Sequence, residues 1–230
     1  MSARRTGPRR VTHETYLMVF GTVYAALAVN VLLLVSSLPL VLGLVTTDPA
    51  RSWPLLALVA PLAAPGAVAA FGVFGAVSAD PGAPVVRTFV RTWRAVLGRA
   101  LAVGALAVAA VVVLSVDVRA VWGRPVGAVA IPVFVVLAVL AAVTALHAGV
   151  LLAERPSTRV GPLLKAACYL ALRRWYLTVV SVGVVGLLVA LLAARPAIAL
   201  GVAAAPLLYA VWANTRYALR PVLGPGAAAG

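Results

Sequence analysis

Long apolar segments alternate with short charged segments along the whole chain. About 20 apolar helical residues are needed to cross the hydrocarbon core of a bilayer. Five uncharged segments reach that length, and a sixth comes close to it. Together they are Thr15–Thr47, Ser52–Ala79, Ala100–Val116, Pro125–Ala153, Trp175–Ala194 and Pro196–Thr215. The pattern therefore predicts a polytopic membrane protein.

The expected fold is an all-α membrane protein, with residues 1–230 forming a single integral membrane domain. It is a bundle of six transmembrane helices with two cytoplasmic interfacial amphipathic helices. We place the spans at about residues 16–45, 53–78, 100–116, 127–153, 175–194 and 196–214. Pro39 is expected to kink the first span or to end its regular part. A tight hairpin is expected at Arg195-Pro196, because one unbroken helix of about 40 residues would be about 60 Å long, twice the bilayer core.

The distribution of basic residues predicts the orientation, since cytoplasmic loops carry an excess of Lys and Arg. Under the six-span model fifteen of the 19 basic residues lie on one side. They are Arg4, Arg5, Arg9, Arg10, Arg87, Arg91, Arg94, Arg99, Arg155, Arg159, Lys165, Arg173, Arg174, Arg216 and Arg220. The other side has Arg51, Arg119, Arg124 and Arg195. Both termini are thus expected in the cytoplasm. The first apolar run is far longer than the core of a signal peptide, so we expect it to be retained.

The loop before the third span carries an amphipathic pattern. Within residues 84–99, Arg87, Arg91 and Arg94 recur at helical spacing on one face, and Phe89 and Trp93 lie on the opposite, apolar face. This spacing predicts a helix that lies in the membrane interface. Its arginines are interpreted either as anchors on anionic lipid or as a docking face for a cytoplasmic or membrane partner.

The loop before the fifth span repeats this arrangement. Gly161-Pro162 begins a predicted helix whose leucines and alanines face the bilayer or the bundle. Lys165, Arg173 and Arg174 are expected to reach the lipid headgroups or a partner.

The composition leaves little material for catalysis. Charged residues make up 10% of the chain, and the acidic ones all fall at the ends of predicted spans, at Glu14, Asp48, Asp80, Asp117 and Glu154. The single Cys168 excludes a disulfide framework within the chain, and no known nucleotide-binding, metalloprotease or hydrolase motif occurs. The net charge of +14 is explained by arginines that flank membrane spans, so nucleic acid is not expected as a partner. We therefore expect no enzymatic activity, no metal and no cofactor.

Two polar side chains fall inside predicted spans. His147 lies seven residues before Glu154, so the two share a face of the fourth span. It acts either as a proton relay or substrate contact, or as a neutral side chain bonded to a backbone carbonyl. Asn30 lies in the middle of the first span and should face the bundle, because an amide in hydrocarbon needs a partner. We expect it to bond to another span, with residues 61–66 as the favoured region because prolines free carbonyls there.

In the first part of the chain, Asn30 is followed by an apolar run and by the segment Ser36–Val41, SSLPLV. This order resembles the Asn and Ser-Leu-Pro signature of the YesL-like family, which consists of bacterial membrane proteins of unknown function. The segment Ala64–Arg94 resembles the family's second span and the cytoplasmic helix after it. The likeness covers about Tyr16–Arg99. It departs from the family where a Thr-x-Gly-Pro turn is expected, because Gly43, Asp48 and Pro49 occupy that region.

The resemblance implies a bacterial cytoplasmic membrane protein that assists sugar uptake, since members of the family are often encoded beside carbohydrate ABC transporters. We therefore expect a non-enzymatic accessory factor whose partners are anionic lipids and ABC-transporter permease subunits. The alternative is a small transporter or a membrane substrate-binding subunit, in which Asn30 and His147 line a cavity at the bilayer midplane. A third hypothesis, a membrane-embedded enzyme, is disfavoured because no cluster of polar residues is available.

Overall fold

The computed structural model describes residues 13–195 and 198–223, and for residues 13–19, 193 and 220–223 it describes the backbone alone. Within these ranges the regular structure is helical, as the sequence predicts. The elements are α1 (His13–Ser36), α2 (Leu38–Thr46), α3 (Pro49–Val59), the 3₁₀ turn η1 (Ala60–Ala63), α4 (Ala64–Ala79), α5 (Val85–Val121), α6 (Gly127–Glu154), α7 (Val160–Arg173), α8 (Trp175–Ala194), the π-helical turn η2 (Ala199–Ala203) and α10 (Ala204–Leu223).

The first predicted span is a bent pair of helices. α1 and α2 meet at Ser37 with a bend of 72°. Pro39 stands in the first turn of α2, where its missing N–H leaves the carbonyl of Val35 without a helical donor. The Ser36 and Ser37 hydroxyls both donate to the carbonyl of Leu33, at 3.0 and 2.6 Å. The kink expected at Pro39 is therefore confirmed, and the bend lies two residues before the proline itself.

The second predicted span is confirmed and is longer than expected, since α3, η1 and α4 run together over Pro49–Ala79. The 3₁₀ turn η1 falls at Pro61, which explains the change of helical geometry. Helix α5 packs closely against the end of this turn and the start of α4, because a Cβ placed on Gly104 would come within 2.7 Å of the Ala64 side chain. Since the lipid chains are as apolar as the side chains, helices in a bilayer are held together by this kind of close approach.

The predicted interfacial helix over residues 84–99 is wrong as a separate element. It is continuous with the third span in α5, a helix of 37 residues and about 55 Å. Protein covers one side of its apolar face, because Val85, Phe89, Val96 and Ala100 are buried, whereas Val86 is 50% exposed. The four buried residues form one stripe at helical spacing that packs against α4. The amphipathic pattern therefore marks a contact with protein, and α5 continues without a break from the predicted loop into the third predicted span.

The second predicted amphipathic helix is observed as α7. Its buried residues are Leu163, Ala167, Leu170 and Ala171, and they pack toward α6 and the rest of the protein. The chain turns at Arg174, and α8 begins with Trp175. The predicted span at residues 175–194 matches α8.

Within the described residues, four helices are long and apolar enough to cross a membrane, or five if the bent pair of α1 and α2 is taken as one span. The predicted sixth span at residues 196–214 corresponds to η2 and α10, which continue to Leu223 and carry Arg216 within the helix. Within the described residues that helix does not meet the same requirement, so six spans remain a prediction.

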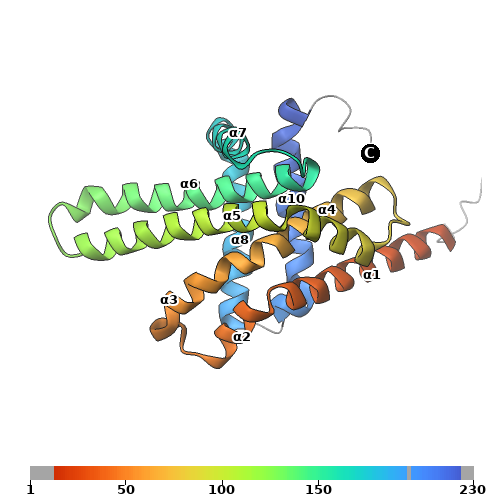
Figure 1. The fold of residues 1–230 in the computed structure, drawn as a ribbon, viewed down its shortest axis with the longest axis horizontal. Coiled ribbons are helices and arrows are strands. Elements are labelled where there is room, and N and C mark those ends of the chain that lie inside the picture. The colour runs from red at the N-terminus through yellow and green to blue at the C-terminus, as the bar shows by residue number, and fades with distance from the viewer. Residues whose placement is uncertain (1–12, 196–197, 224–230) are drawn as a thin grey trace, which may run out of the picture.

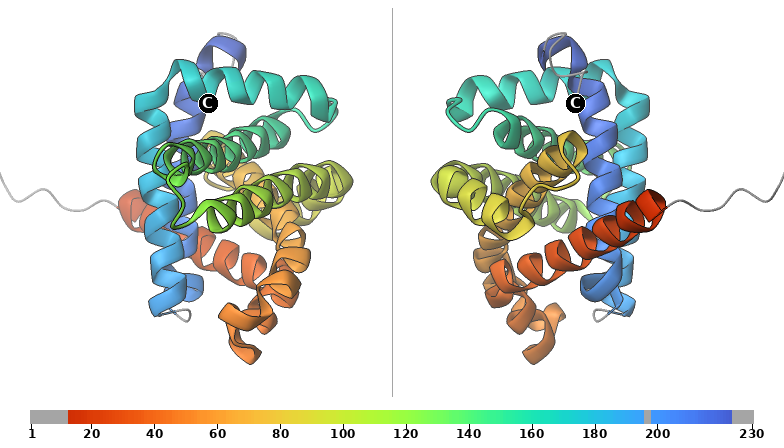
Figure 2. Two further views of the ribbon diagram at one scale, coloured as in Figure 1. Left: turned by 90° about the vertical axis from the view of Figure 1, so that its left-hand side faces the viewer. Right: turned by 90° about the vertical axis from the view of Figure 1, so that its right-hand side faces the viewer.

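The helices do not run in one common direction. α8 and α10 cross the hairpin of α5 and α6, as the views in Figures 1 and 2 show. The ends that we expect in the cytoplasm nevertheless lie together: the start of α1, the α4–α5 connection and α7 occupy the upper and right-hand side of Figure 1. The α2–α3 and α5–α6 connections and the end of α8 occupy the lower and left-hand side.

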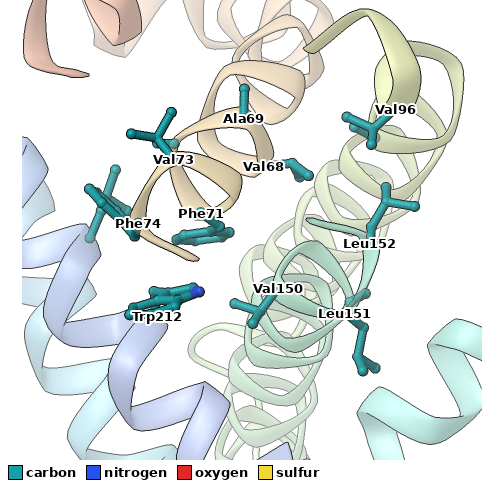
Figure 3. Close-up of a cluster of buried hydrophobic side chains, with 14 of the residues drawn as sticks. Val68, Ala69, Phe71, Val73, Phe74, Val96, Val150, Leu151, Leu152 and Trp212 are labelled. Atoms are coloured by element: carbon teal, nitrogen blue, oxygen red, sulfur yellow. The ribbon is translucent and has the colours of Figure 1, made fainter. Parts of the chain in front are cut away.

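The core is built around α4. Of the apolar window in Pro49–Ala79, 44% is buried inside the protein, against 6% for each of the other three candidate spans. Phe71 and Phe74 point toward Trp212 of α10, and Val68 points toward α6 (Figure 3). Trp212, Tyr209 and Phe74 form a ring cluster with centroid separations of 5.4–6.2 Å. α4 is thus the shared neighbour that positions the polar residues described next.

Candidate functional site

Asn30 joins the first helix to α10 through both ends of its amide. It is 2% exposed. Its Nδ2 donates to the carbonyl of Gly201 at 3.0 Å, and its Oδ1 accepts from the backbone N–H of Ala205 at 2.7 Å. The expectation that Asn30 faces the protein interior and bonds to another helix agrees with these contacts. The favoured partner region, residues 61–66, is wrong.

Pro206 explains why the partner is the start of α10. Proline has no N–H, so it cannot continue the ladder, and its ring pushes against the carbonyl four residues before it. The backbone widens here into η2, in which the N–H of Ala204 reaches back to the carbonyl of Ala199. The carbonyl of Gly201 and the N–H of Ala205 are four residues apart and would pair in a regular α-helix. The amide of Asn30 is inserted between them and satisfies both.

His147 is also buried, at 1% exposure. Its Nδ1 lies 2.9 Å from the carbonyl of Val143, one turn earlier in α6. A carbonyl oxygen only accepts, so this contact places a proton on Nδ1 and leaves Nε2 as the acceptor of the neutral ring. The arrangement matches the interpretation of His147 as a side chain bonded to its own helix. Asn30 binds η2 and α10 instead, so the two residues do not form a common site.

A polar contact that the sequence did not reveal joins α6 to α10. Arg216 Nε lies 3.5 Å from Glu154 Oε1, with the two side chains 21% and 24% exposed. The Arg216 guanidinium carbon also lies 5.2 Å from the centre of the Trp212 ring. A cation over an indole face is attracted by the ring quadrupole. A signal was present in the sequence: Arg216 and Glu154 both follow long apolar runs on the same expected side of the membrane.

Asn214 links α10 to α8. Its Nδ2 donates to the carbonyl of Leu177 at 2.7 Å and to the Ser181 hydroxyl at 2.8 Å. The side chain therefore connects two helices and does not cap its own. Together with Asn30, it fixes α10 against both α1 and α8.

The described cavities have mainly apolar walls. One of about 320 Å³ lies between α1, α4 and α10, and includes Val73 and Tyr209 in its lining. One of about 350 Å³ lies between α4, α5 and α6, and one of about 430 Å³ lies between α5, α6 and α7. Neither Asn30 nor His147 lines any of these three. Within the described chain no group of three His, Cys, Asp or Glu side chains is placed to hold a metal ion.

The six basic residues singled out from the sequence separate into two places. Arg87, Arg91 and Arg94 are exposed and line one open hollow of about 770 Å³ between α1 and the start of α5. Lys165 and Arg173 are exposed on the outer face of α7. The Arg173 guanidinium donates to the Tyr169 hydroxyl at 3.1 Å and lies over that ring.

Arg174 plays a different part from its neighbours. It is half-buried, donates to the carbonyl of Tyr217 at 3.3 Å, and its guanidinium carbon lies 5.8 Å from the centre of the Tyr217 ring. It therefore connects the α7–α8 turn to α10. Arg174 therefore contacts another helix, whereas Arg173 contacts Tyr169 of its own helix.

The chain matches no protein-family model, no curated protein and no solved structure. The likeness of residues 16–99 to the YesL-like family therefore remains a prediction from the residues that carry it.

Proposed function

We propose that this multi-span membrane protein is a non-enzymatic accessory factor for a carbohydrate ABC transporter, and that the outer face of α7 contacts the permease. The supporting observation is how its polar side chains are used. Asn30, His147 and Asn214 are each bonded to helix backbone, and the described cavities beside them are apolar. The polar side chains of the interior therefore hold the helices together, and the polar groups available to a partner lie on the surface of the protein.

α7 is suited to a contact at the membrane surface. Its inner face is buried, whereas Tyr169 and Leu172 are 58% and 60% exposed. Lys165 and Arg173 flank them on the same face, because residues three and four apart in a helix are neighbours. Aromatic and arginine side chains are enriched in protein interfaces. The transporter as partner rests on the family resemblance alone.

The α5–α6 hairpin is the second outward-facing feature of the protein. Large apolar side chains are exposed along it: Leu106, Val113, Val116, Val129, Val133, Val135, Val136, Leu137 and Val139. A surface of this kind needs lipid or the apolar flank of another membrane protein. In the proposed function the hairpin faces lipid and holds the protein in the bilayer, while α7 makes the cytoplasmic contact with the permease.

Site-specific photocrosslinking in cells tests the proposal. A photoreactive residue at Tyr169 or Leu172 should capture a permease subunit, and the same residue at Val133 on the lipid-facing hairpin should not. Capture at neither α7 position, with the protein present at normal level, would contradict the docking face.

The small-transporter alternative is favoured by one observation, the break in α10 beside Asn30, since broken helices form midplane sites in many transporters. Purified protein in liposomes decides between the two. The accessory function predicts no uptake of labelled sugar above that of empty liposomes. Uptake that is lost with Asn30→Leu would overturn the accessory function in favour of transport.

A further inference from the structure

We propose that the hollow between α1 and α5 binds the headgroup of an anionic phospholipid with two phosphate groups, of the cardiolipin type. We call this hollow the basic groove. Tyr24 of α1 and Arg87, Arg91 and Arg94 of α5 line it together with valines of α5. The inference does not depend on the proposed function.

Among the described side chains, no acidic group forms an ion pair with the arginines of the basic groove. In the described part of the chain, the two ion pairs are Arg51 with Asp48 and Arg216 with Glu154, and neither involves a groove arginine. Asp80 is the acidic residue nearest in sequence, and its carboxylate accepts from the N–H of Gly82. Three exposed guanidinium groups around one hollow therefore attract an anion from outside the protein.

The spacing of the arginines fits two phosphate groups. Arg87 and Arg94 are seven residues apart, which corresponds to about 10 Å along the helix. A guanidinium binds a phosphate in a bidentate manner at about 2.8 Å, so one phosphate is satisfied by one or two arginines. A row of three arginines along about 10 Å of helix matches a headgroup with two phosphates better than a headgroup with one phosphate. The hollow of about 770 Å³ has the size of a ligand site.

An apolar strip on α1 continues from the groove and supplies the place for acyl chains. Leu27, Val31 and Val35 are exposed at 49%, 60% and 62%, and they share the helix face of Tyr24. The strip runs from the expected cytoplasmic side toward the membrane interior. A basic hollow that opens onto a lipid-facing strip is the arrangement expected for a phospholipid, since basic pockets between membrane helices on the cytoplasmic side bind such headgroups.

Lipid titration of the full-length protein in a neutral detergent, followed by native mass spectrometry, tests the inference. The probes are cardiolipin, phosphatidylglycerol, phosphatidylcholine and inorganic phosphate. Cardiolipin should bind at least about tenfold more tightly than phosphatidylglycerol at equal phosphate. Arg87→Gln, Arg91→Gln and Arg94→Gln together should weaken cardiolipin binding about a hundredfold, because each basic residue near anionic lipid contributes a factor of about five.

A matched variant keeps the test specific. Arg119→Gln, Arg124→Gln and Arg195→Gln remove the same charge from exposed positions elsewhere, and should weaken cardiolipin binding by less than about threefold. An equal loss of cardiolipin affinity in both triple variants would mean that general surface charge, and not the basic groove, attracts the lipid, and it would overturn the inference. Binding of phosphatidylglycerol or inorganic phosphate as tight as that of cardiolipin would also overturn it.

The acyl strip gives a second, independent arm of the test. Val31→Gln places an amide in the strip without touching the arginines. It should weaken cardiolipin binding severalfold and leave any binding of inorganic phosphate unchanged. If cardiolipin binding is unaffected by Val31→Gln, the strip does not hold the acyl chains and the lipid assignment is wrong.

Discussion

Replacing Asn30 with leucine is the sharpest test of how α10 is held. The change removes the two hydrogen bonds to Gly201 and Ala205 while keeping a side chain of similar length. Asn30 is 2% exposed, so water does not replace the lost amide. We expect a less stable protein in which η2 relaxes toward a regular α-helical turn.

The magnitude follows from the geometry. Hydrogen bonds between membrane helices contribute about 0.6 kcal/mol each on average and at most about 1.7 kcal/mol. The two groups left behind are four residues apart in the same helix and can bond to each other once the amide is gone. This recovery keeps the loss at about 1–2 kcal/mol, which lowers the unfolding temperature of a chain of this size by about 2–8 °C.

Thermal unfolding in detergent, monitored by tryptophan fluorescence, measures the loss. Val31→Leu is the control, because it changes a lipid-facing side chain one residue away and should leave the unfolding temperature unchanged. An unfolding temperature equal to that of the wild type in Asn30→Leu, together with impaired sugar uptake in cells, would refute the structural role and indicate contact with substrate.

Three further predictions follow from the fold. Gly66→Leu should reduce the yield of folded protein, because a Cβ at Gly66 collides with the Ser36 hydroxyl, whereas Gly98→Leu, with open space around it, should be tolerated in the same detergent extraction. Glu154→Gln should destabilise the protein by about 1 kcal/mol through loss of the ion pair with Arg216, and the difference from wild type should shrink in high salt; no salt dependence would argue against that pair. Topology reporters test the orientation, and an outside signal at Ser157 would exclude the six-span arrangement. Reporters fused after Asp48, Trp122 and Arg195 should read outside, and reporters fused at Asp80, Ser157 and Gly230 should read inside.

The helical elements and most of their boundaries were predictable from the sequence, because a long uncharged apolar run in a membrane has helix as its main solution. The bend near Pro39 was predictable from the proline, and the separate helix α7 was predictable from the amphipathic pattern that begins at Gly161-Pro162. The continuity of α5 was not, because an apolar stripe at helical spacing looks the same whether it faces lipid or α4. Burial of Phe89 and Val96 against protein distinguishes the two.

The contacts of Asn30 were only half predictable. Burial followed from the cost of an unbonded amide in hydrocarbon, but the identity of the partner depended on which proline-broken helix packs nearby. Pro61 and Pro206 give the same local signal, and only the packing of α1 against η2 and α10 selects the second. The basic groove likewise required the fold, since Tyr24 is far in sequence from the arginines it accompanies.

The bond from Asn30 to Gly201 spans 171 residues, and this separation affects how the protein is made. At a translation rate of about 5–20 residues per second, the first helix waits about 9–34 s in the membrane before the carbonyl it binds has been synthesised. During that interval the Asn30 amide is a polar group without its partners on an otherwise apolar segment. A chain that ends before Gly201 lacks both partners of this amide, so its first helix keeps an unbonded polar group that only the completed η2 and α10 can satisfy.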